Sequence, residues 1–367
     1  MDYNWQQSGW PDFRFKPDAL EDALLRFERQ AGRVSGLLEG LPEGLGSEAV
    51  IDLMISEAIT TSAIEGEVLE REEVKSSIRN HLGLNTPDSP VGDARAEGAG
   101  ELMVAVRESF SESLSTGMLF DWHAMLMKGD RRLLVGAWRE GGDPMQVISG
   151  RIDRPTVHYE APPSTRVPAE MKKFVDWFNR TAPGGEETMM HAPVRAGIAH
   201  LYFESIHPFE DGNGRIGRAI SEKALSQGLG APALMSLSQS IEANRKDYYN
   251  ALQRAQHSLE ITEWLAWFTG MVAEAQEDAE GRVMFVLRKS KFFERFRSRF
   301  NERQLKIVSR MLESGPDGFE GGMNARKYVA LTKVSKATAT RDLQQLAGME
   351  AVRSIGGGRS TRYELNL

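Results

Sequence analysis

The chain has 367 residues and a formal net charge of −7, from 45 Lys and Arg against 52 Asp and Glu. This length corresponds to roughly two or three domains of about 150 residues, and 41% hydrophobic with 26% charged residues excludes a fibrous or wholly disordered protein. The lack of cysteine excludes disulfides and thiolate sites, and without an apolar run of about 20 residues or a secretory signal we expect a cytoplasmic protein with no membrane association.

The first part of the chain is predicted to be helical behind an aromatic N-terminal segment. That segment contains Trp5, Trp10, Phe13 and Phe15, and Asp18 is the expected N-cap of the helix that follows. Apolar residues then recur at helical spacing, and stretches rich in Gly, Pro, Asn or Asp interrupt them. The helices predicted on this basis span residues 18–38, 47–64, 70–81, 94–110 and 116–127.

A different pattern interrupts the helices between residues 136 and 163. The runs 147–149 and 156–159 are β-prone, and a segment at 150–155 that contains Gly and Pro separates them. This pattern predicts a small β-hairpin set in a helical domain. Helices are predicted again at 168–180, 192–206, 215–227 and 241–275.

The C-terminal segment has its own layout and its own charge. Helices are predicted at 301–313, 324–331 and 335–346, followed by a glycine-turned hairpin at 352–365, and this order is typical of a winged helix. Residues 281–367 carry 18 Lys and Arg against 8 Asp and Glu, whereas residues 1–280 carry 27 against 44. Such a division indicates two electrostatic roles, unless the basic segment only offsets the charge of the acidic body.

DNA is therefore a candidate partner of residues 281–367. Ser335 is the expected N-cap of a recognition helix. The residues that would reach phosphates or base edges are Lys336, Thr338 and Arg341 on that helix and Arg353, Arg359 and Arg362 in the wing. The alternative is a winged helix that binds protein or forms a homodimer.

One short segment concentrates side chains suited to phosphate chemistry: His207-Pro208-Phe209-Glu210-Asp211-Gly212-Asn213-Gly214-Arg215-Ile216-Gly217-Arg218. Pro208 prevents the preceding helix from continuing, and a Gly-rich turn that opens a helix presents its amides to an anion. Arg215 and Arg218 share a helix face and can each bind phosphate oxygens through two N–H groups. Asp211 is a hard oxygen ligand suited to Mg²⁺, and His207 can accept a proton near neutral pH.

Together these residues suit the attack of a hydroxyl on a nucleotide phosphate. Each alone would fit an ordinary helix–loop–helix with a glycine turn, but the string matches H-P-F-x-x-G-N-G-R-x-x-R at every defined position. The chain thus resembles Fic-domain proteins, which transfer AMP from ATP to protein hydroxyls. The fold class expected is mainly α, with a helical Fic core, a small β-hairpin flap and a C-terminal winged helix-turn-helix domain.

The resemblance also implies a role for each motif residue. His207 would be the general base, Asp211 would hold Mg²⁺, and Phe209 would pack into the core. The ATP-binding residues would be Gly212, Asn213, Gly214, Arg215, Ile216, Gly217, Arg218 and Tyr249. His200 and Glu204, four residues apart, have a spacing that can bind zinc, but such pairs are common in helices and we interpret them as structural.

An inhibitory residue is implied by a second match. Thr61-Ser62-Ala63-Ile64-Glu65-Gly66 fits the family's inhibitory motif [S/T]-x-x-x-E-[G/N]. In the family this glutamate forms a salt bridge with the second arginine of the active-site motif, which is Arg218 here. Glu65 would then compete with the γ-phosphate, so that ATP binds with its α-phosphate misaligned. The alternative is an ordinary helix end with Gly66 after it.

Two further segments take a role from the resemblance. The hairpin at 145–159 would be a flap that pairs with an extended segment of a target protein and brings its hydroxyl to His207, unless the hairpin only packs. Residues 241–249 resemble a segment that lies near the adenine, where Tyr249 is slightly favoured over Tyr248, although tyrosines at helical spacing often only pack.

The domains expected are an accessory segment (1–45), an inhibitory helix region (46–92), a Fic catalytic core (93–280) and a winged-helix domain (281–367). The function predicted is an auto-inhibited protein adenylyltransferase that uses ATP and Mg²⁺ to modify a Ser, Thr or Tyr hydroxyl of a target protein. The alternatives are a DNA-binding regulator with a nucleotide-sensing body and a Fic enzyme that removes AMP from modified proteins.

Overall fold

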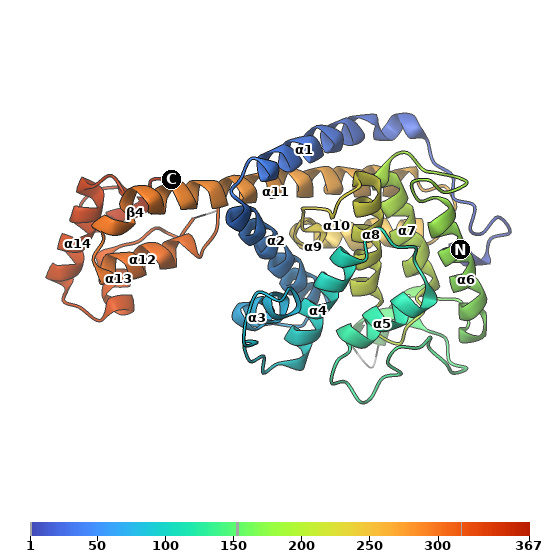
Figure 1. The fold of residues 1–367 in the computed structure, drawn as a ribbon. Helices are drawn as coiled ribbons and strands as arrows, with labels where there is room; N and C mark the ends of the chain where they lie inside the picture. The colour runs from blue at the N-terminus through green and yellow to red at the C-terminus, as the bar shows by residue number, and fades with distance from the viewer. Residues whose placement is uncertain (1, 152–153, 317) are drawn as a thin grey trace. The chain divides into compact units, whose positions relative to one another are not determined.

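The computed structural model describes residues 2–151, 154–316 and 318–367 (Figure 1). In these residues the secondary structure is mainly helical, with two separate two-stranded sheets, so the prediction of a mainly α fold with small hairpins is confirmed. The chain divides into two compact units, Met1–Val34 with Val50–Ala279 and Ser35–Ala49 with Glu280–Leu367. No helix of the described residues combines the length and the apolar character needed to cross a bilayer.

The helices that lie wholly or partly in the first unit follow the sequence pattern closely. They are α1 (Glu21–Glu39), α2 (Glu43–Ile64), α3 (Arg71–His81), α4 (Ala94–Glu108), α5 (Thr116–Leu126), α6 (Val167–Arg180), α7 (Ala192–Ile206), α8 (Asn213–Leu229), α9 (Leu237–Ala243), α10 (Arg245–Ala255) and α11 (Thr262–Phe296).

Helices α7 and α8 form the centre of the first unit and lie side by side (Figure 1). Every residue of α7 is buried, as expected for a helix that is surrounded by other helices on all sides. α4 and α5 also pack against α8. The connection from α7 to α8 is the segment that contains the phosphate-chemistry motif, so the most deeply packed helix pair of the unit positions the site.

The predicted hairpin is confirmed. β1 (Gln146–Arg151) and β2 (Arg154–Glu160) pair antiparallel, with Gln146 opposite Glu160 and a register shift between Val147 and Ile148. Residues 152–153 of the predicted flap lie outside the described residues. The base of the hairpin lies next to α7, where the Tyr159 hydroxyl meets the Ser205 carbonyl.

The N-terminal aromatic segment forms hydrogen bonds at the base of the β1–β2 hairpin. The Tyr159 hydroxyl donates to the Ser205 carbonyl at 2.6 Å, and the Trp5 indole N–H donates to the Glu160 carbonyl at 2.8 Å. The fully buried Asn4 donates its side-chain amide to the Ser205 hydroxyl at 2.8 Å. These bonds join the N-terminus, β2 and the last turn of α7.

Two predictions about helix limits are wrong. The single helix predicted at 241–275 is divided, because α9 ends before Asn244 and residues 256–261 are not helical. There the backbone of Arg14 donates to the Leu259 carbonyl at 2.7 Å and accepts the Ile261 amide at 2.8 Å. This long-range pairing overrides local helix propensity. Asp18 is not an N-cap, because it lies inside a 3₁₀ helix, Pro17–Leu20, that leads into α1.

The second unit contains a helical segment followed by a hairpin in the predicted order. Its elements are α12 (Glu302–Leu312), α13 (Ala325–Thr332), α14 (Lys336–Gly348), β3 (Val352–Ile355) and β4 (Arg362–Leu365). The strands pair antiparallel, and the Ser335 hydroxyl caps α14 by accepting the Thr338 amide at 3.2 Å, as predicted. Buried Asp342 on α14 accepts the Arg303 guanidinium and the Tyr328 hydroxyl, each at 2.9 Å.

The basic residues predicted to face DNA are mostly on the surface of this unit. Lys336, Arg341 and Arg362 are exposed. Arg353 is also exposed and forms an ion pair with Glu364 at 3.1 Å. The side chain of Arg359 lies outside what the structure describes.

Candidate active site

The predicted general base, His207, occupies the left-handed turn that ends α7. Its φ is 50° and its ψ is 61°, a conformation uncommon for residues with a β-carbon. Its amide donates to the Phe203 carbonyl at 2.9 Å, and the following proline cannot extend the helix. The His207 side chain keeps 17% of its surface exposed, and its Nδ1 is buried.

A buried arginine that the sequence analysis did not identify holds this turn. Arg139 donates through Nε to the His207 carbonyl at 2.7 Å and through Nη2 to the Pro162 carbonyl at 2.5 Å and the Ile206 carbonyl at 3.4 Å. Its positive charge lies where the last carbonyls of α7 have no helical partner. Arg139 precedes the predicted hairpin in a stretch without regular spacing, so its role has no signal in the sequence.

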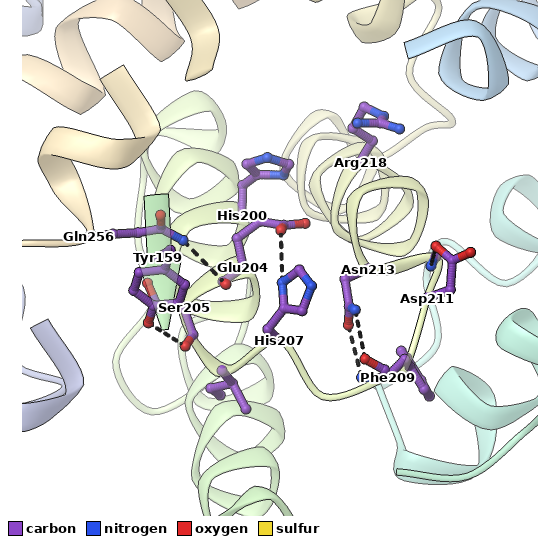
Figure 2. A network of polar contacts seen from close by, with 12 residues as sticks. Tyr159, His200, Glu204, Ser205, His207, Phe209, Asp211, Asn213, Arg218 and Gln256 are labelled. Carbon is purple, nitrogen blue, oxygen red and sulfur yellow. Dashed lines mark hydrogen bonds and ion pairs between the residues drawn. The ribbon is translucent and has the colours of Figure 1, made fainter. Parts of the chain in front are cut away.

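Hydrogen bonds and ring stacking hold the rest of the connection between α7 and α8. Asn213 exchanges two 2.9 Å hydrogen bonds with the backbone of Phe209, as Figure 2 shows. Phe209 is fully buried, as predicted, and stacks on His123 with ring centroids 4.0 Å apart. His123 accepts the Gly136 amide at Nδ1, so its Nε2 donates to the Asp211 carbonyl at 3.2 Å. Burial lowers the pKa of His123, which keeps it in this neutral form.

Asp211 and Gly212 turn the chain into α8. Gly212 has a φ of 80° at the N-cap position, a conformation that glycine adopts at little cost. The Asp211 carboxylate is exposed and accepts the Gly212 amide at 2.6 Å through Oδ1. The connection thus presents a solvent-facing carboxylate beside the N-terminal amides of a helix.

The N-terminal turn of α8 is the segment in which the sequence predicts an anion cradle. The first amides of a helix have no carbonyl partner inside it and carry the positive end of the helix dipole. A β-carbon on Gly214 would collide with Oε1 of Glu65 and lie 3.2 Å from Nη1 of Arg218. The glycine therefore allows a carboxylate to lie directly against the cradle, where a phosphate oxygen would be expected to bind.

Glu65, the first residue after α2, provides that carboxylate and pairs with Arg218. Oε1 of Glu65 lies 2.8 Å from Nη2 of Arg218. The Arg218 side chain is 2% exposed, and it also donates to the Thr61 hydroxyl at 2.7 Å and the Thr61 carbonyl at 3.0 Å. Burial opposes its charge, but Glu65, Tyr248 and Glu57 together outweigh this effect and raise the pKa of Arg218. The pairing expected from the sequence is present.

A second carboxylate from the same turn binds the other arginine of the motif. Oε2 of Glu67 lies 2.7 Å from Nη1 of Arg215, whose side chain is 3% exposed. The short inhibitory motif ends at Gly66, so the sequence analysis did not identify this contact. Both motif arginines are therefore paired with acidic residues that follow α2.

The remaining predicted ATP-binding residues differ in position. Ile216 is fully buried in the apolar core, and a β-carbon on Gly217 would lie 2.6 Å from a carboxylate oxygen of Glu204. Tyr248 is buried and bonds to His200 at 2.8 Å, whereas Tyr249 is 41% exposed on the same helix. Partial burial and the negative charge of Glu65 raise the pKa of Tyr249.

Three stretches of the chain match known families. Residues 113–225 match the model of the Fic/DOC family. Residues 3–84 match a domain of unknown function called DUF4172, and residues 321–366 match the C-terminal domain of DIP2311-like transcriptional regulators. The helical connection that carries His207 and the two arginines thus belongs to a Fic/DOC domain.

Two curated proteins with similar sequences are named adenylyltransferases. The protein adenylyltransferase Fic of Nematostella vectensis is 27% identical over 114 residues, which cover 31% of this chain and 25% of that protein. A probable protein adenylyltransferase of Aquifex aeolicus is 31% identical over 98 residues, which cover 27% of each protein. The matched residues span about a quarter of the length of each of these relatives.

Solved structures share the fold over more of the chain. A Fic family protein from Desulfovibrio desulfuricans G20 covers 97% of this chain, with 98% of its own length aligned, a TM-score of 0.57 and 23% identity. A Fic domain containing signalling protein from Bacteroides thetaiotaomicron covers 71% of this chain, with 97% of its own length aligned, a TM-score of 0.53 and 15% identity. The protein thus has a Fic fold and a Fic/DOC domain homologous to those of Fic protein adenylyltransferases.

Proposed function

We propose that the protein is an auto-inhibited protein adenylyltransferase that transfers AMP from ATP to a Ser, Thr or Tyr hydroxyl of a target protein. The observation that carries this proposal is the convergence of His207, the N-terminal turn of α8 and two buried arginines on one connection. These groups supply a proton acceptor, an anion cradle and two phosphate ligands.

In the proposed reaction the target hydroxyl attacks the α-phosphorus of ATP. His207 takes the hydroxyl proton at Nε2, the new bond forms between the hydroxyl oxygen and the α-phosphorus, and the bond to the β-phosphate oxygen breaks to release pyrophosphate. The amides of residues 212–215 and the Arg215 guanidinium would bind the α- and β-phosphates, and Arg218 the γ-phosphate. Such positioning and charge stabilisation account for most of the catalysis in phosphate transfer.

Asp211 fits the requirement for a Mg²⁺ ligand. Mg²⁺ is bound in nucleotide sites through one or two carboxylates, substrate phosphates and water rather than by a protein cage. The carboxylate of Asp211 is exposed next to the proposed phosphate cradle, which is the donor set that such an ion needs. When bound, Mg²⁺ would neutralise charge on the phosphates and on the pyrophosphate that leaves.

Inhibition follows from the position of Glu65. Its carboxylate lies at the cradle and pairs with Arg218 at 2.8 Å, so the γ-phosphate of ATP must compete for the same guanidinium. ATP held away from Arg218 would have its α-phosphate out of line with the attacking hydroxyl. Tyr249, which is exposed on α10, would contact the adenine.

The hairpin β1–β2 would dock the target. An extended segment of the target protein could add to the backbone edge of the hairpin by β-augmentation. Because Tyr159 at the base of β2 is bonded to the end of α7, a segment paired along the hairpin would be held close to His207.

The test is a mass spectrum of the protein, and of lysate proteins mixed with it, after incubation with ATP and Mg²⁺. We expect an AMP adduct that is more abundant with Glu65→Gly than with the wild type and absent with Glu65→Gly/His207→Ala. An equal amount of adduct in wild type and Glu65→Gly would contradict inhibition by Glu65. The reverse reaction is tested by adding an AMP-modified substrate, and a lack of both addition and removal in every variant would refute the enzyme.

A second candidate function, DNA binding by the second unit, is favoured by charge. Residues 281–367 carry the excess of basic residues, and Lys336 and Arg341 are exposed on α14. The match of residues 321–366 to a transcriptional-regulator domain supports the same function. We propose that α14 enters the major groove of a duplex while the β3–β4 hairpin contacts its backbone.

The full-length protein should shift a DNA duplex at low salt, with an affinity that falls steeply as salt rises. Lys336→Ala/Arg341→Ala should weaken binding by about 10-fold or more, whereas Lys172→Ala/Lys173→Ala, which removes two exposed charges from α6, should not. Equal losses in both variants would refute α14 as the contact surface.

A further inference from the structure

We propose that Glu204 is a positioning residue for His207: its carboxylate accepts a hydrogen bond from Nδ1 of the imidazole and so leaves Nε2 free to accept the proton of the attacking hydroxyl. The inference rests on the proposed function, in which His207 is the general base. It concerns a residue that the sequence analysis interpreted as structural.

The contact itself is the first argument. Glu204 and His207 lie three residues apart at the end of α7, and Oε2 of Glu204 is 3.6 Å from Nδ1 of His207, as Figure 2 shows. Among the described residues, Nδ1 of His207 is buried without a hydrogen-bond partner. Buried polar atoms are nearly always bonded, and catalytic contacts that are long without substrate often tighten when substrate binds.

The surroundings of Glu204 leave His207 as its partner. The neighbouring His200 uses Nε2 for the Tyr248 hydroxyl at 2.8 Å and Nδ1 for the Ser221 hydroxyl at 3.2 Å. Burial lowers the pKa of His200, which makes it a neutral link rather than a counter-ion. Since both nitrogens of His200 are engaged, it cannot donate to the carboxylate.

The electrostatics of Glu204 agree with this pairing. Its side chain is 7% exposed, and burial by itself would favour the neutral acid. Electrostatic interactions with His207 and Arg218 are among the causes that outweigh burial and hold the pKa of Glu204 below its usual value. A buried, ionised carboxylate therefore faces Nδ1 of the imidazole, as in the Asp–His pair of serine proteases.

A glycine at position 217 makes room for this carboxylate. A β-carbon there would lie 2.6 Å from Oε1 of Glu204 and 3.4 Å from the His200 ring. Gly217 thus lies where α8 passes the Glu204 carboxylate. This close approach gives a steric reason for glycine at a position that the motif leaves undefined.

The first test separates chemistry from nucleotide binding. In the Glu65→Gly background, Glu204→Gln should lower kcat for AMP transfer by about 100-fold, the usual range for a general base, and change the Kd for ATP less than twofold. Glu187→Gln, which removes an exposed carboxylate from the surface, is the matched control. An unchanged kcat, or a parallel loss of ATP binding, would overturn the positioning role.

The second test reads the tautomer directly and needs no activity. In ¹⁵N-histidine-labelled protein at alkaline pH, where imidazoles are neutral, the His207 signal is assigned by its loss in His207→Gln. We expect Nδ1 to carry the proton in the wild type and Nε2 to carry it in Glu204→Met, which keeps the length of the side chain but removes the acceptor. The same tautomer in both proteins would overturn the proposal even if the protein transfers AMP.

An independent observation carries a second inference, on regulation of the same site. We infer that Glu67 blocks Arg215 as Glu65 blocks Arg218, so that two carboxylates occupy the phosphate ligands together. The Glu67–Arg215 distance is 2.7 Å, and the Arg215 side chain is 3% exposed while Glu67 is 29% exposed. A carboxylate that reaches a buried guanidinium from the solvent side occupies the direction from which a phosphate would approach it.

The proposed effects of Glu67 on Arg215 and of Glu65 on Arg218 can be separated by comparing the binding of ADP with that of ATP. ADP lacks the γ-phosphate proposed for Arg218 but retains the α- and β-phosphates proposed for Arg215. Glu67→Gln should therefore tighten ADP and ATP binding by about 10-fold, or 1.4 kcal/mol, whereas Glu65→Gly should tighten ATP binding more than ADP binding.

Calorimetric titration of each nucleotide into wild type, Glu67→Gln and Glu65→Gly measures these differences. Glu70→Gln is the matched control, because it removes an exposed carboxylate three residues farther along the same segment. An ADP affinity that is equal in wild type and Glu67→Gln, or raised equally in Glu70→Gln, would overturn the role of Glu67. The titrations measure binding only, so AMP transfer still judges the proposed enzyme separately.

Discussion

We predict that a carboxylate pair, buried Glu57 on α2 and half-buried Glu222 on α8, makes the stability of the first unit depend on pH. Glu57 accepts the Ser236 hydroxyl at 2.7 Å, the Ser238 amide at 3.0 Å and the Ser238 hydroxyl. Glu222, on α8, is the neighbouring carboxylate. Burial and the negative charge of Glu57, opposed in part by Arg107, raise the pKa of Glu222 to about 8.

The sign and size of the effect follow from this shift. Between about pH 4.5 and 8 the folded protein binds a proton at Glu222 that the unfolded chain has released, so the free energy of unfolding falls as pH rises through this range. The full shift would correspond to about 4–5 kcal/mol at 1.36 kcal/mol per unit. The Glu222 side chain is partly exposed, and solvent screens its interactions. We therefore expect the free energy of unfolding to fall by about 2 kcal/mol over this range.

The Glu222→Gln side chain stays neutral at every pH, so this variant tests directly whether Glu222 is protonated in the folded protein. In urea unfolding monitored by circular dichroism, the variant should match the wild type near pH 5 and exceed it by about 2 kcal/mol at pH 8. Glu72→Gln, at an exposed position on α3, is the control and should follow the wild type throughout. Parallel curves for Glu222→Gln and the wild type would refute a protonated Glu222. Burial lowers the pKa of Lys223 to about 8, which affects both proteins equally.

Three other substitutions test the packing around the two functional regions. Asp342→Ala should lower the free energy of unfolding of the second unit by about 2–4 kcal/mol in urea, because it leaves the Tyr328 hydroxyl and Arg303 without their buried partner; a loss below 0.5 kcal/mol would contradict this. Phe209→Ala should cost about 3–4 kcal/mol in the first unit, and thermal unfolding would show an unchanged Tm if the ring were not part of the core. Arg139→Met in the Glu65→Gly background should lower the rate of AMP transfer by about 10-fold or more, because the left-handed turn at His207 would be lost. An unchanged rate would show that the turn persists without Arg139.

Local sequence determined most of the secondary structure and the location of the candidate site. Proline and glycine act through the backbone alone, so the end of α7 before Pro208 and the start of α8 after Gly212 could be predicted from their positions. Helical and alternating spacing of apolar residues likewise predicted the helices and the hairpin. The Glu65–Arg218 pair was predictable only through the family resemblance, because the two residues lie 153 positions apart.

Only the tertiary structure decided which side chains meet at the site. Arg139, Glu67 and Glu204 bind His207 or the motif arginines through contacts that depend on how helices pack, and their own sequence neighbours give no sign of them. The break between α10 and α11 likewise depends on backbone bonds to Arg14 near the N-terminus. Periodicity reports whether a face is apolar, whereas the partner of a buried charge is fixed by distance and burial in three dimensions, and these arise only when the chain is folded.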